Sequence, residues 1–297
     1  MKNITIAAVS ALGILGLSTQ LTSCSLVSQA VSSVRSIDMS QYPGLSAVAK
    51  AQQGMMETYG QSAKLILRSR LAALDALVLD AEAIAANEKA GDTYELATKI
   101  AANGKEKQKL LQAQIENITN AQDMDVINKA KEETASVDAM IAEGYSELSK
   151  ATSQTNANIA ATNKEGDMYI AQSMQHLAAA EAKIVESHSL LQESQIMELQ
   201  LAATAAVHTA ALVEGMSSAS AVDKALLAVQ FRPILFFLTG LPEEFDHQNE
   251  VRSMWEEHAA KSNITLKTKQ VGSIKEVAAK AAEKLTGAIS LDSFGAF

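Results

Sequence analysis

The 297-residue chain carries 34 acidic and 25 basic side chains, which gives a formal net charge of −9 at pH 7. This acidic balance argues against nucleic acid as a partner and disfavours an electrostatic grip on anionic lipid, because phosphate groups attract basic surfaces. Aromatic residues make up only 4% of the chain. Together with abundant alanine, this composition favours a thin helical core over a bulky β-rich one.

The first 23 residues have the pattern of an export signal. Lys2 supplies one positive charge, and residues 4–17 are apolar or small apart from two hydroxyl side chains. This stretch is too short to span a bilayer comfortably, because a membrane helix needs about 20 apolar residues. We therefore predict that residues 1–23 are a signal peptide that is removed after export.

Leu21-Thr22-Ser23-Cys24 directly follows this apolar stretch. These residues resemble the lipobox of bacterial lipoproteins, in which an aliphatic residue and two small residues precede the cysteine. The resemblance implies that signal peptidase II makes Cys24 the new N-terminus and that this cysteine receives fatty acids such as palmitate. Two or more acyl chains give a stable membrane anchor. The alternative is an ordinary secretory signal followed by a chance cysteine.

The residue after the cysteine bears on location. In Gram-negative lipoproteins an aspartate there often retains the protein at the inner membrane, whereas this chain has Ser25. The resemblance therefore implies a lipid-anchored protein of the cell envelope, with the outer membrane favoured if the cell is Gram-negative. Cys24 is the only cysteine, so no intramolecular disulfide is possible.

Proline divides the exported part. Residues 24–43, rich in Ser and Val and closed by Pro43, are predicted to be a lipidated tether. Residues 44–232 contain no proline, which inside a helix costs about 3 kcal/mol. We therefore predict a mainly α fold in which residues 44–228 form an elongated bundle of long antiparallel helices with coiled-coil-like packing.

Apolar spacing predicts where these helices begin and end. A heptad seam runs through residues 56–85, and a break is expected at 87–92. There Gly91 suits the left-handed position after a helix end, and Asp92 suits the N-cap of the next helix. Further helical segments are expected over 94–122 and 123–155, both with weaker seams. The Gly-Asp-x-Tyr pattern at 91–94 recurs at 166–169, so a duplicated hairpin and a chance recurrence remain as alternatives.

The longest helical segment is expected over residues 167–214. One predicted seam carries Met174, Leu177, Ile184 and Leu191, and a second passes through Leu201. Two histidines on or near these seams, at 188 and 208, are interpreted as hydrogen-bonded packing residues rather than ligands.

The character of the chain changes near residue 228. Residues 229–238 are strongly apolar, a helix is expected from Pro242 in its first turn to about Ser262, and residues 264–269 alternate like an edge strand. Residues 273–285 are predicted to form a last amphipathic helix. For 229–297, a small β-α-β-α element and a continued helical fold remain as alternatives.

Chemistry-bearing motifs are few. Glu244 and His247 form an E-x-x-H, half of the ligand set of di-iron carboxylate bundles, but no other histidine has a glutamate three residues before it. Both residues are therefore kept as candidates for a metal site, against the simpler interpretation of a solvated polar face. No catalytic residues and no cofactor are expected, because no nucleophile, phosphate-binding or C-x-x-C motif is found.

The apolar segment allows a second interpretation. Its candidate membrane-contact or partner-contact residues are Phe231, Ile234, Leu235, Phe236, Phe237 and Leu238. Long helices with a short apolar element resemble helical pore-forming toxins in architecture, without a shared motif. Burial against the bundle is the favoured interpretation, because the segment is too short to span a bilayer.

These observations predict a non-enzymatic, lipid-anchored envelope protein that acts as a spacer, scaffold or partner-binding surface. The expected partners are a membrane, through the lipid, and another protein or a second copy of the chain, through helical surfaces. A membrane-active protein using residues 231–238 is the first alternative, and a metal-binding bundle is the second.

Overall fold

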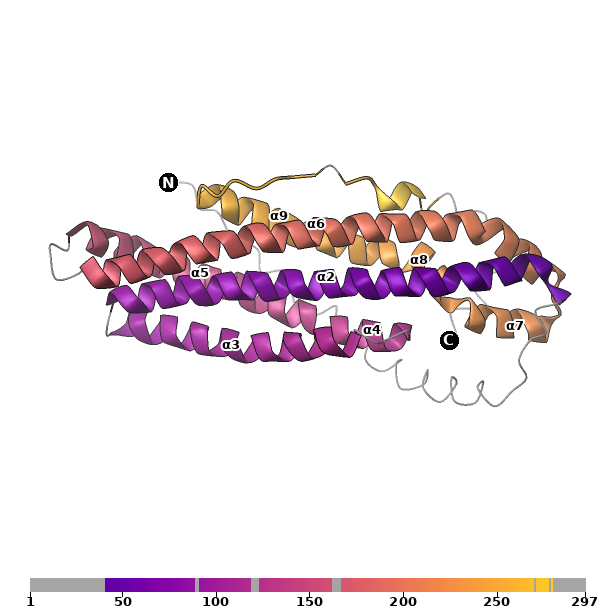
Figure 1. The fold of residues 1–297 in the computed structure, drawn as a ribbon, viewed down its shortest axis with the longest axis horizontal. Coiled ribbons are helices and arrows are strands. Elements are labelled where there is room, and N and C mark those ends of the chain that lie inside the picture. Colours follow the sequence, from indigo (N-terminus) through magenta and orange to yellow (C-terminus); the bar gives the residue numbers. More distant parts are fainter. Residues whose placement is uncertain are drawn as a thin grey trace, which may run out of the picture.

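The computed structural model describes residues 41–88, 91–118, 123–161, 167–269, 271–277 and 279. The predicted signal peptide, Cys24 and nearly all of the tether lie outside these residues. The described part is a mainly α, elongated bundle (Figure 1), as the sequence predicts.

Two long helices form the axis of the bundle. Helix α2 covers Pro43–Glu88 and helix α6 covers Asp167–Ser218, and they lie side by side along most of their length (Figure 1). At 1.5 Å per residue the 52 residues of α6 extend about 80 Å. The proline-free sequence therefore forms helices as long as predicted.

Helix α2 is the central element, because α3, α5 and α6 all pack against it. Every predicted seam residue of α2 is buried or half-buried, and burial extends well beyond that seam. The additional buried positions include Ser62, Ser69 and Arg70. Apolar spacing predicts one contact face, whereas α2 is enclosed on several sides.

The contact between α2 and α6 has small and polar side chains at its centre. Ser69 Oγ donates a hydrogen bond of 2.9 Å to the Ser187 carbonyl oxygen. Because the serine side chain is short, this hydrogen bond requires the backbones of the two helices to lie close together. Along α6 the predicted seam holds at Ile184 and Leu191, which are buried, but fails at Met174 and Leu177, which are 62% and 38% exposed. Serines occupy buried seam positions that apolar spacing does not detect.

Helices α3 (Asp92–Ile118), α4 (Met124–Lys131) and α5 (Glu133–Ala161) cover another side of α2. Gly91 has the predicted positive φ, +92°. Its carbonyl accepts the first helical hydrogen bond of α3 from Glu95, so Gly91 rather than Asp92 holds the N-cap position. The segment predicted from Asp123 does begin there, with the Asp123 carboxylate accepting from the Asp125 amide, but it is divided by a turn at Glu132.

Gly104 of α3 is fitted against α2. A methyl group at this position would lie 2.4 Å from Val78 Cγ2, and Val78 is buried and stiff about χ1. We expect Gly104→Ala to lower the free energy of unfolding by about 1–2 kcal/mol, because overpacking outweighs the gain in helix propensity. Denaturant unfolding followed by circular dichroism measures this change.

The matched control is Gly54→Ala in α2, where nothing lies within 4 Å of the added methyl group. That substitution is expected to raise the free energy of unfolding by about 0.5–1 kcal/mol through helix propensity alone. Equal effects of the two substitutions would contradict the close approach of α3 to α2.

The C-terminal part continues the helical fold. Helices α7 (Ala221–Gln230), α8 (Arg232–Thr239) and α9 (Leu241–Lys261) follow one another, and α9 has the predicted limits. The predicted β-α-β-α alternative is wrong for the described residues. The apolar segment is helix α8, and residues 264–269 have no regular secondary structure, so the predicted edge strand is wrong. Of the last predicted helix, residues 274–277 and 279 are helical, and the rest lies outside the described residues.

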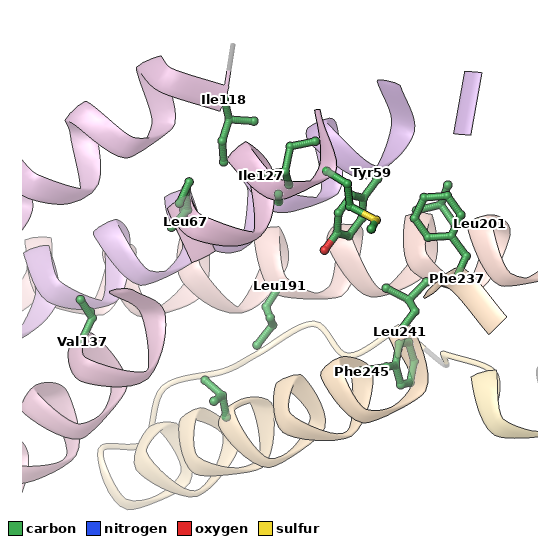
Figure 2. Close-up of a cluster of buried hydrophobic side chains, with 14 of the residues drawn as sticks. Tyr59, Leu67, Ile118, Ile127, Val137, Leu191, Leu201, Phe237, Leu241 and Phe245 are labelled. Carbon is green, nitrogen blue, oxygen red and sulfur yellow. The ribbon is translucent and has the colours of Figure 1, made fainter. Parts of the chain in front are cut away.

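One apolar cluster joins helices α2 to α9 in the described part of the chain. It includes Leu74 of α2, Leu111 of α3, Ile141 of α5, Leu201 of α6 and Phe237 of α8, all buried. Figure 2 shows side chains from α2, α6, α8 and α9 meeting in it. Helices α8 and α9 therefore pack into the same core as the long helices.

Candidate functional site

Ionisable side chains meet inside the bundle where α4 and α5, α6 and α9 pack around α2. We call this group the polar centre. Its members are Tyr59, Ser62 and Arg70 of α2, Lys131 of α4, Asp138 of α5, Glu198 of α6, and Glu244 and Gln248 of α9. Each of these side chains lies on the side of its helix that faces the interior of the bundle. The packing of the helices therefore holds each side chain at a fixed position.

A bidentate ion pair joins α2 to α5. Arg70 Nε and Nη2 donate hydrogen bonds of 3.0 and 3.1 Å to the two carboxylate oxygens of Asp138, and the Arg70 side chain is only 1% exposed. Burial alone would raise the pKa of Asp138. The Arg70 guanidinium, together with His247 of α9 at 3.4 Å, outweighs burial and lowers that pKa.

Glu198 brings a carboxylate into the contact between α6, α2 and α9. Its Oε1 accepts hydrogen bonds from Ser62 Oγ at 3.2 Å and from Gln248 Nε2 at 2.7 Å. Glu198 is fully buried, and burial raises the pKa of its carboxyl group despite the nearby Lys131 ammonium. Its second oxygen has no hydrogen-bond partner among the described residues.

Lys131 completes the polar centre from α4. Its ammonium pairs with the Glu244 carboxylate of α9 and donates to the Tyr59 hydroxyl at 3.3 Å. Tyr59 in turn donates a hydrogen bond of 2.6 Å to Asn128 Oδ1. Burial lowers the pKa of Lys131 to about 8, and burial raises the pKa of the Tyr59 phenol. The Lys131 side chain is only 11% exposed, which is the cause of this lowered pKa.

These contacts define what the polar centre does. Two ion pairs, Arg70 with Asp138 between α2 and α5 and Lys131 with Glu244 between α4 and α9, fix how these helices lie against one another. The hydrogen bonds of Glu198 join α6 to α2 and α9 in the same way. Buried pairs of this kind contribute little net stability, because desolvation offsets their attraction, but breaking one pair leaves a charge uncompensated. The arrangement therefore specifies helix register more than it adds stability.

Glu198 makes the stability depend on pH. Its pKa is higher in the folded protein than in the unfolded chain, so its contribution to stability decreases as pH rises from about 4.5 through the folded value. We expect Glu198→Gln, which keeps an oxygen that can accept from Ser62 and Gln248, to abolish this decrease. The stability difference between variant and wild type should therefore grow from pH 4.5 to 7.

Thermal or denaturant unfolding over that pH range measures the difference. The matched control is Glu193→Gln, an exposed glutamate on the same helix, whose stability relative to wild type should stay constant. A constant difference for Glu198→Gln as well would contradict the burial of an ionised Glu198.

A second ionisable group lies nearer the end of α2. Burial raises the pKa of Asp80 to about 7, the nearby Tyr145 hydroxyl opposes this increase, and the Glu181 carboxylate adds to it. The Tyr145 ring packs at 4.0 Å against the ring of His258, whose pKa burial lowers. These groups again join α2, α5 and α9 through polar side chains.

Glu244 and His247, the predicted metal candidates, have separate partners. Glu244 pairs with Lys131, whereas His247 lies beside Asp138. No group of three or more His, Cys, Asp or Glu side chains in the described part of the chain is arranged to hold a metal ion. The interpretation as a solvated face is wrong for Glu244, which is 19% exposed, and fits His247, which is 48% exposed.

The two seam histidines differ. His188 is 1% exposed, with Nε2 at 3.2 Å from Glu256 Oε1 and at 3.4 Å from Gln192 Nε2, which confirms it as a hydrogen-bonded packing residue. His208 is half-buried.

The apolar segment is packed into the bundle. Phe231, Ile234, Phe237 and Leu238 are buried, and Leu235 and Phe236 are partly buried against the same cluster. Tyr59 contacts both phenylalanines edge to face, with ring centroids 5.6 Å from Phe236 and 5.4 Å from Phe237. Figure 2 shows Phe237 close to Leu241 and Phe245 of α9. The favoured interpretation, burial, describes this structure.

Sequence reasoning missed the polar centre itself. Arg70 and Glu198 lie within long helices between apolar seam positions, where spacing alone assigns charged residues to solvent. Both residues interrupt an apolar seam on the packing side of their helix, and this interruption is visible in the sequence. Arg70, for example, lies between Leu67 and Leu74, two buried seam positions that are seven residues apart. Which partners they meet depends on helices distant in the sequence.

An open depression lies at the bundle end where α2 finishes and α6 begins. It has a volume of about 490 Å³, and its lining includes several alanines together with Tyr94, Lys105, His176 and Glu82. Glu82 contacts both Lys105, at 2.6 Å, and His176, at 3.6 Å.

Comparisons with protein-family models, curated proteins and solved structures found no match. The fold class, a mainly α helical bundle, is therefore defined by the structure alone.

Proposed function

We propose that this chain is a lipid-anchored protein of the cell envelope, without enzymatic activity, whose bundle serves as a spacer or scaffold that presents helical surfaces to a protein partner. The lipid is attached at Cys24, and the outer membrane is the favoured location in a Gram-negative cell. Two features of the described residues support this role.

The observation that carries the proposal is where the chain enters the bundle. Helix α2 starts at one end of the long axis, beside α7, whereas the end of α2 and the starts of α3 and α6 lie at the opposite end (Figure 1). The 46 residues of α2 extend about 70 Å. A lipid on Cys24 would therefore hold one end of the bundle at a membrane and place the other end far from the attachment point.

The remote end has features of a contact surface. Tyr94, which lines the depression, is 37% exposed, and Met174 on α6 at the same end is 62% exposed. Exposed large apolar side chains gathered at one place favour association with another protein. The paired charges of the polar centre, by contrast, are engaged in holding helices together, which supports a structural rather than a catalytic role.

The decisive experiment is to isolate the protein from its native envelope and to analyse its N-terminal peptide by mass spectrometry. We expect the peptide to begin at Cys24 and to carry fatty acids. Cys24→Ser should move the protein from the membrane fraction to the soluble or uncleaved fraction, because the anchor is lost. An unmodified Cys24 thiol in the membrane-bound protein would contradict the proposal.

Location is tested with Ser25. The lipobox resemblance implies that Ser25→Asp shifts the protein from outer to inner membrane in a Gram-negative host, whereas the matched Ser25→Ala variant stays at the outer membrane. Partner binding is tested with a photo-crosslinking residue at position 94 and, as control, at position 126 on α4, where Val126 is 43% exposed. Crosslinks to a partner from position 94 alone are expected.

The alternative is a membrane-active protein, which one observation favours. Of the described helices, α6 is long and apolar enough to cross a membrane over Ala171–Ser218. Only 33% of an apolar 18-residue stretch within this range is buried in the bundle. One such helix is weak evidence, since core helices of soluble bundles share this property. The apolar segment 231–238 would be the second membrane-contacting element.

Leakage of dye from liposomes tests this alternative. Release by the unlipidated protein, abolished by Phe236→Asp and Phe237→Asp, would support it. Because Phe237 is fully buried, circular dichroism must show that the variants keep their helical content. Absence of leakage by the wild-type protein would favour the scaffold.

A further inference from the structure

After α9 the chain returns along the outside of the bundle (Figure 1). We call residues 264–269 the surface segment. Leu266 packs against the small apolar cluster that contains Ile184 of α6, and the Lys269 amide donates a hydrogen bond of 3.2 Å to Gln192 Oε1 of the same helix. Helix α6 rises about 12 Å from Ile184 to Gln192, whereas three helical residues would span only about 5 Å. The surface segment is therefore extended.

One side of the surface segment faces the bundle and the other faces solvent. Ile264 and Leu266 are half-buried and pack against the same small cluster. Thr265 and residues 267–269 are exposed. Isoleucine and threonine are residues that favour an extended chain. The surface segment thus has the composition of a strand, but it has no partner strand among the described residues.

The backbone of the surface segment is incompletely hydrogen-bonded. The Ile264 amide donates to the Ala259 carbonyl oxygen at 2.8 Å, and the Lys269 amide donates to Gln192. Between these two anchors, the amide and carbonyl groups of residues 265–268 have no hydrogen-bond partner in the described part of the chain. Both ends of the segment are therefore fixed to the bundle, while its middle presents unpaired backbone groups.

The unpaired groups differ in the edge on which they lie. Alternate amides of an extended chain face opposite edges. The amides of Thr265 and Lys267 therefore lie on the edge of the Lys269 amide, which faces α6. The amides of Leu266 and Thr268 lie on the other edge, which we call the outward edge. A row of unpaired N–H and C=O groups of this kind is a template for another extended chain.

Positive charge accumulates here although the whole chain is acidic. Residues 258–275 contain four lysines and neither aspartate nor glutamate. Two of these lysines pair with acidic residues of α9. Lys267 and Lys269 are exposed, and no acidic side chain of the described residues pairs with them. The surface segment therefore attracts negatively charged groups from outside the bundle.

We propose that the surface segment binds an extended acidic peptide of another protein, which adds as a β-strand along the outward edge. Backbone hydrogen bonds to Leu266 and Thr268 supply the attachment, and carboxylates of the peptide pair with Lys267 and Lys269. A second copy of the segment fits less well, because antiparallel pairing would bring the lysines of the two copies together. This inference goes beyond the proposed scaffold role and does not depend on lipidation or on the surface at the remote end.

The test uses the full chain with Cys24→Ser, which removes the lipid attachment point, and a fluorescent peptide of about eight alternating glutamate and valine residues. We expect fluorescence anisotropy to show saturable binding that weakens as salt increases. A peptide with lysine in place of glutamate should bind at least about tenfold more weakly. Failure of the acidic peptide to bind, or equal binding of the two peptides, would overturn the proposal.

Charge variants test the lysines. Lys267→Glu combined with Lys269→Glu should weaken binding of the acidic peptide by at least about tenfold, because attraction becomes repulsion. The matched control is Lys99→Glu combined with Lys109→Glu, two exposed lysines of α3, which should change binding by less than about twofold. Equal losses in the two double variants would show that only the net charge of the chain matters and would overturn the proposed site.

Proline variants test the strand addition. Thr268→Pro removes an amide of the outward edge and should weaken binding by about tenfold, whereas Thr265→Pro removes an amide of the opposite edge and should change binding by less than about threefold. Both threonines are exposed, and proline suits an extended chain, so circular dichroism should show unchanged helical content. Equal losses for the two variants would contradict backbone pairing on the outward edge.

Two other outcomes identify a different occupant and overturn the proposal. The first is binding of the chain to phosphatidylglycerol vesicles that requires Lys267 and Lys269, without binding of the acidic peptide. The second is dimerisation of the chain that Thr268→Pro abolishes, again without peptide binding, which would assign the outward edge to a second copy.

Discussion

Asp138→Leu is expected to lower the free energy of unfolding by about 3–5 kcal/mol, the usual cost of removing one member of a buried ion pair. The Arg70 guanidinium, 1% exposed, would lose its hydrogen bonds to both oxygens of the Asp138 carboxylate and remain charged inside the bundle. Its Nη1 already has no hydrogen-bond partner among the described residues, so the substitution would remove the guanidinium's carboxylate hydrogen bonds. Denaturant unfolding monitored by circular dichroism measures the loss.

The double variant Arg70→Met with Asp138→Leu separates the charge from the packing. Replacing both members by apolar residues of similar size is often neutral or stabilising, so this variant should recover to within about 1 kcal/mol of wild type or exceed it. A single-variant cost below about 1 kcal/mol, the range of exposed pairs, would show that Arg70 and Asp138 are not buried together.

Phe237→Ala is the second substitution with a large expected effect, about 3–5 kcal/mol, because it removes a fully buried aromatic ring and leaves a cavity. The ring also contacts Tyr59 edge to face, so the substitution weakens the packing of the Tyr59 side chain that accepts from Lys131. Unfolding measurements should show a lower midpoint, with helical content retained in the absence of denaturant.

Val126→Ala on α4 is the control for Phe237→Ala. Val126 is 43% exposed to solvent, so its truncation should change stability by no more than about 0.5 kcal/mol. A small effect of Phe237→Ala would show that α8 is not part of the core, and would make the membrane-active alternative more attractive than burial.

Several elements followed from local sequence physics. The seam of α2, the positive φ of Gly91, the start of the α4 segment at Asp123 and the limits of α9 were all predicted, because each depends on residues within a few positions of one another. Proline and glycine act directly on the backbone, so their effects are readable without knowledge of the rest of the fold.

The errors share a different cause. Residues 232–239 have a composition that suits a strand or a helix, and burial beside Tyr59 and α9 favours the helix. Met174 and Leu177 lie in an apolar pattern but face solvent, whereas the buried positions near them include Ser173. Short apolar stretches do not reveal which side of a helix meets a neighbour when that neighbour is distant in the chain.

The lipobox prediction lies outside the described residues and remains the basis of the proposed location. It rests on four consecutive residues and their position after an apolar stretch, and the mass of the N-terminal peptide decides it directly.

The sequence by itself determined that long, proline-free helices form and roughly where they end, because helix propensity and backbone breakers act locally. Only the tertiary structure decided that Arg70 pairs with Asp138, that Glu198 is buried between Ser62 and Gln248, and that α8 belongs to the core. The physical reason is that a charged side chain is tolerated inside a bundle only where another helix supplies its partner, and the identity of that helix depends on the packing of the whole chain.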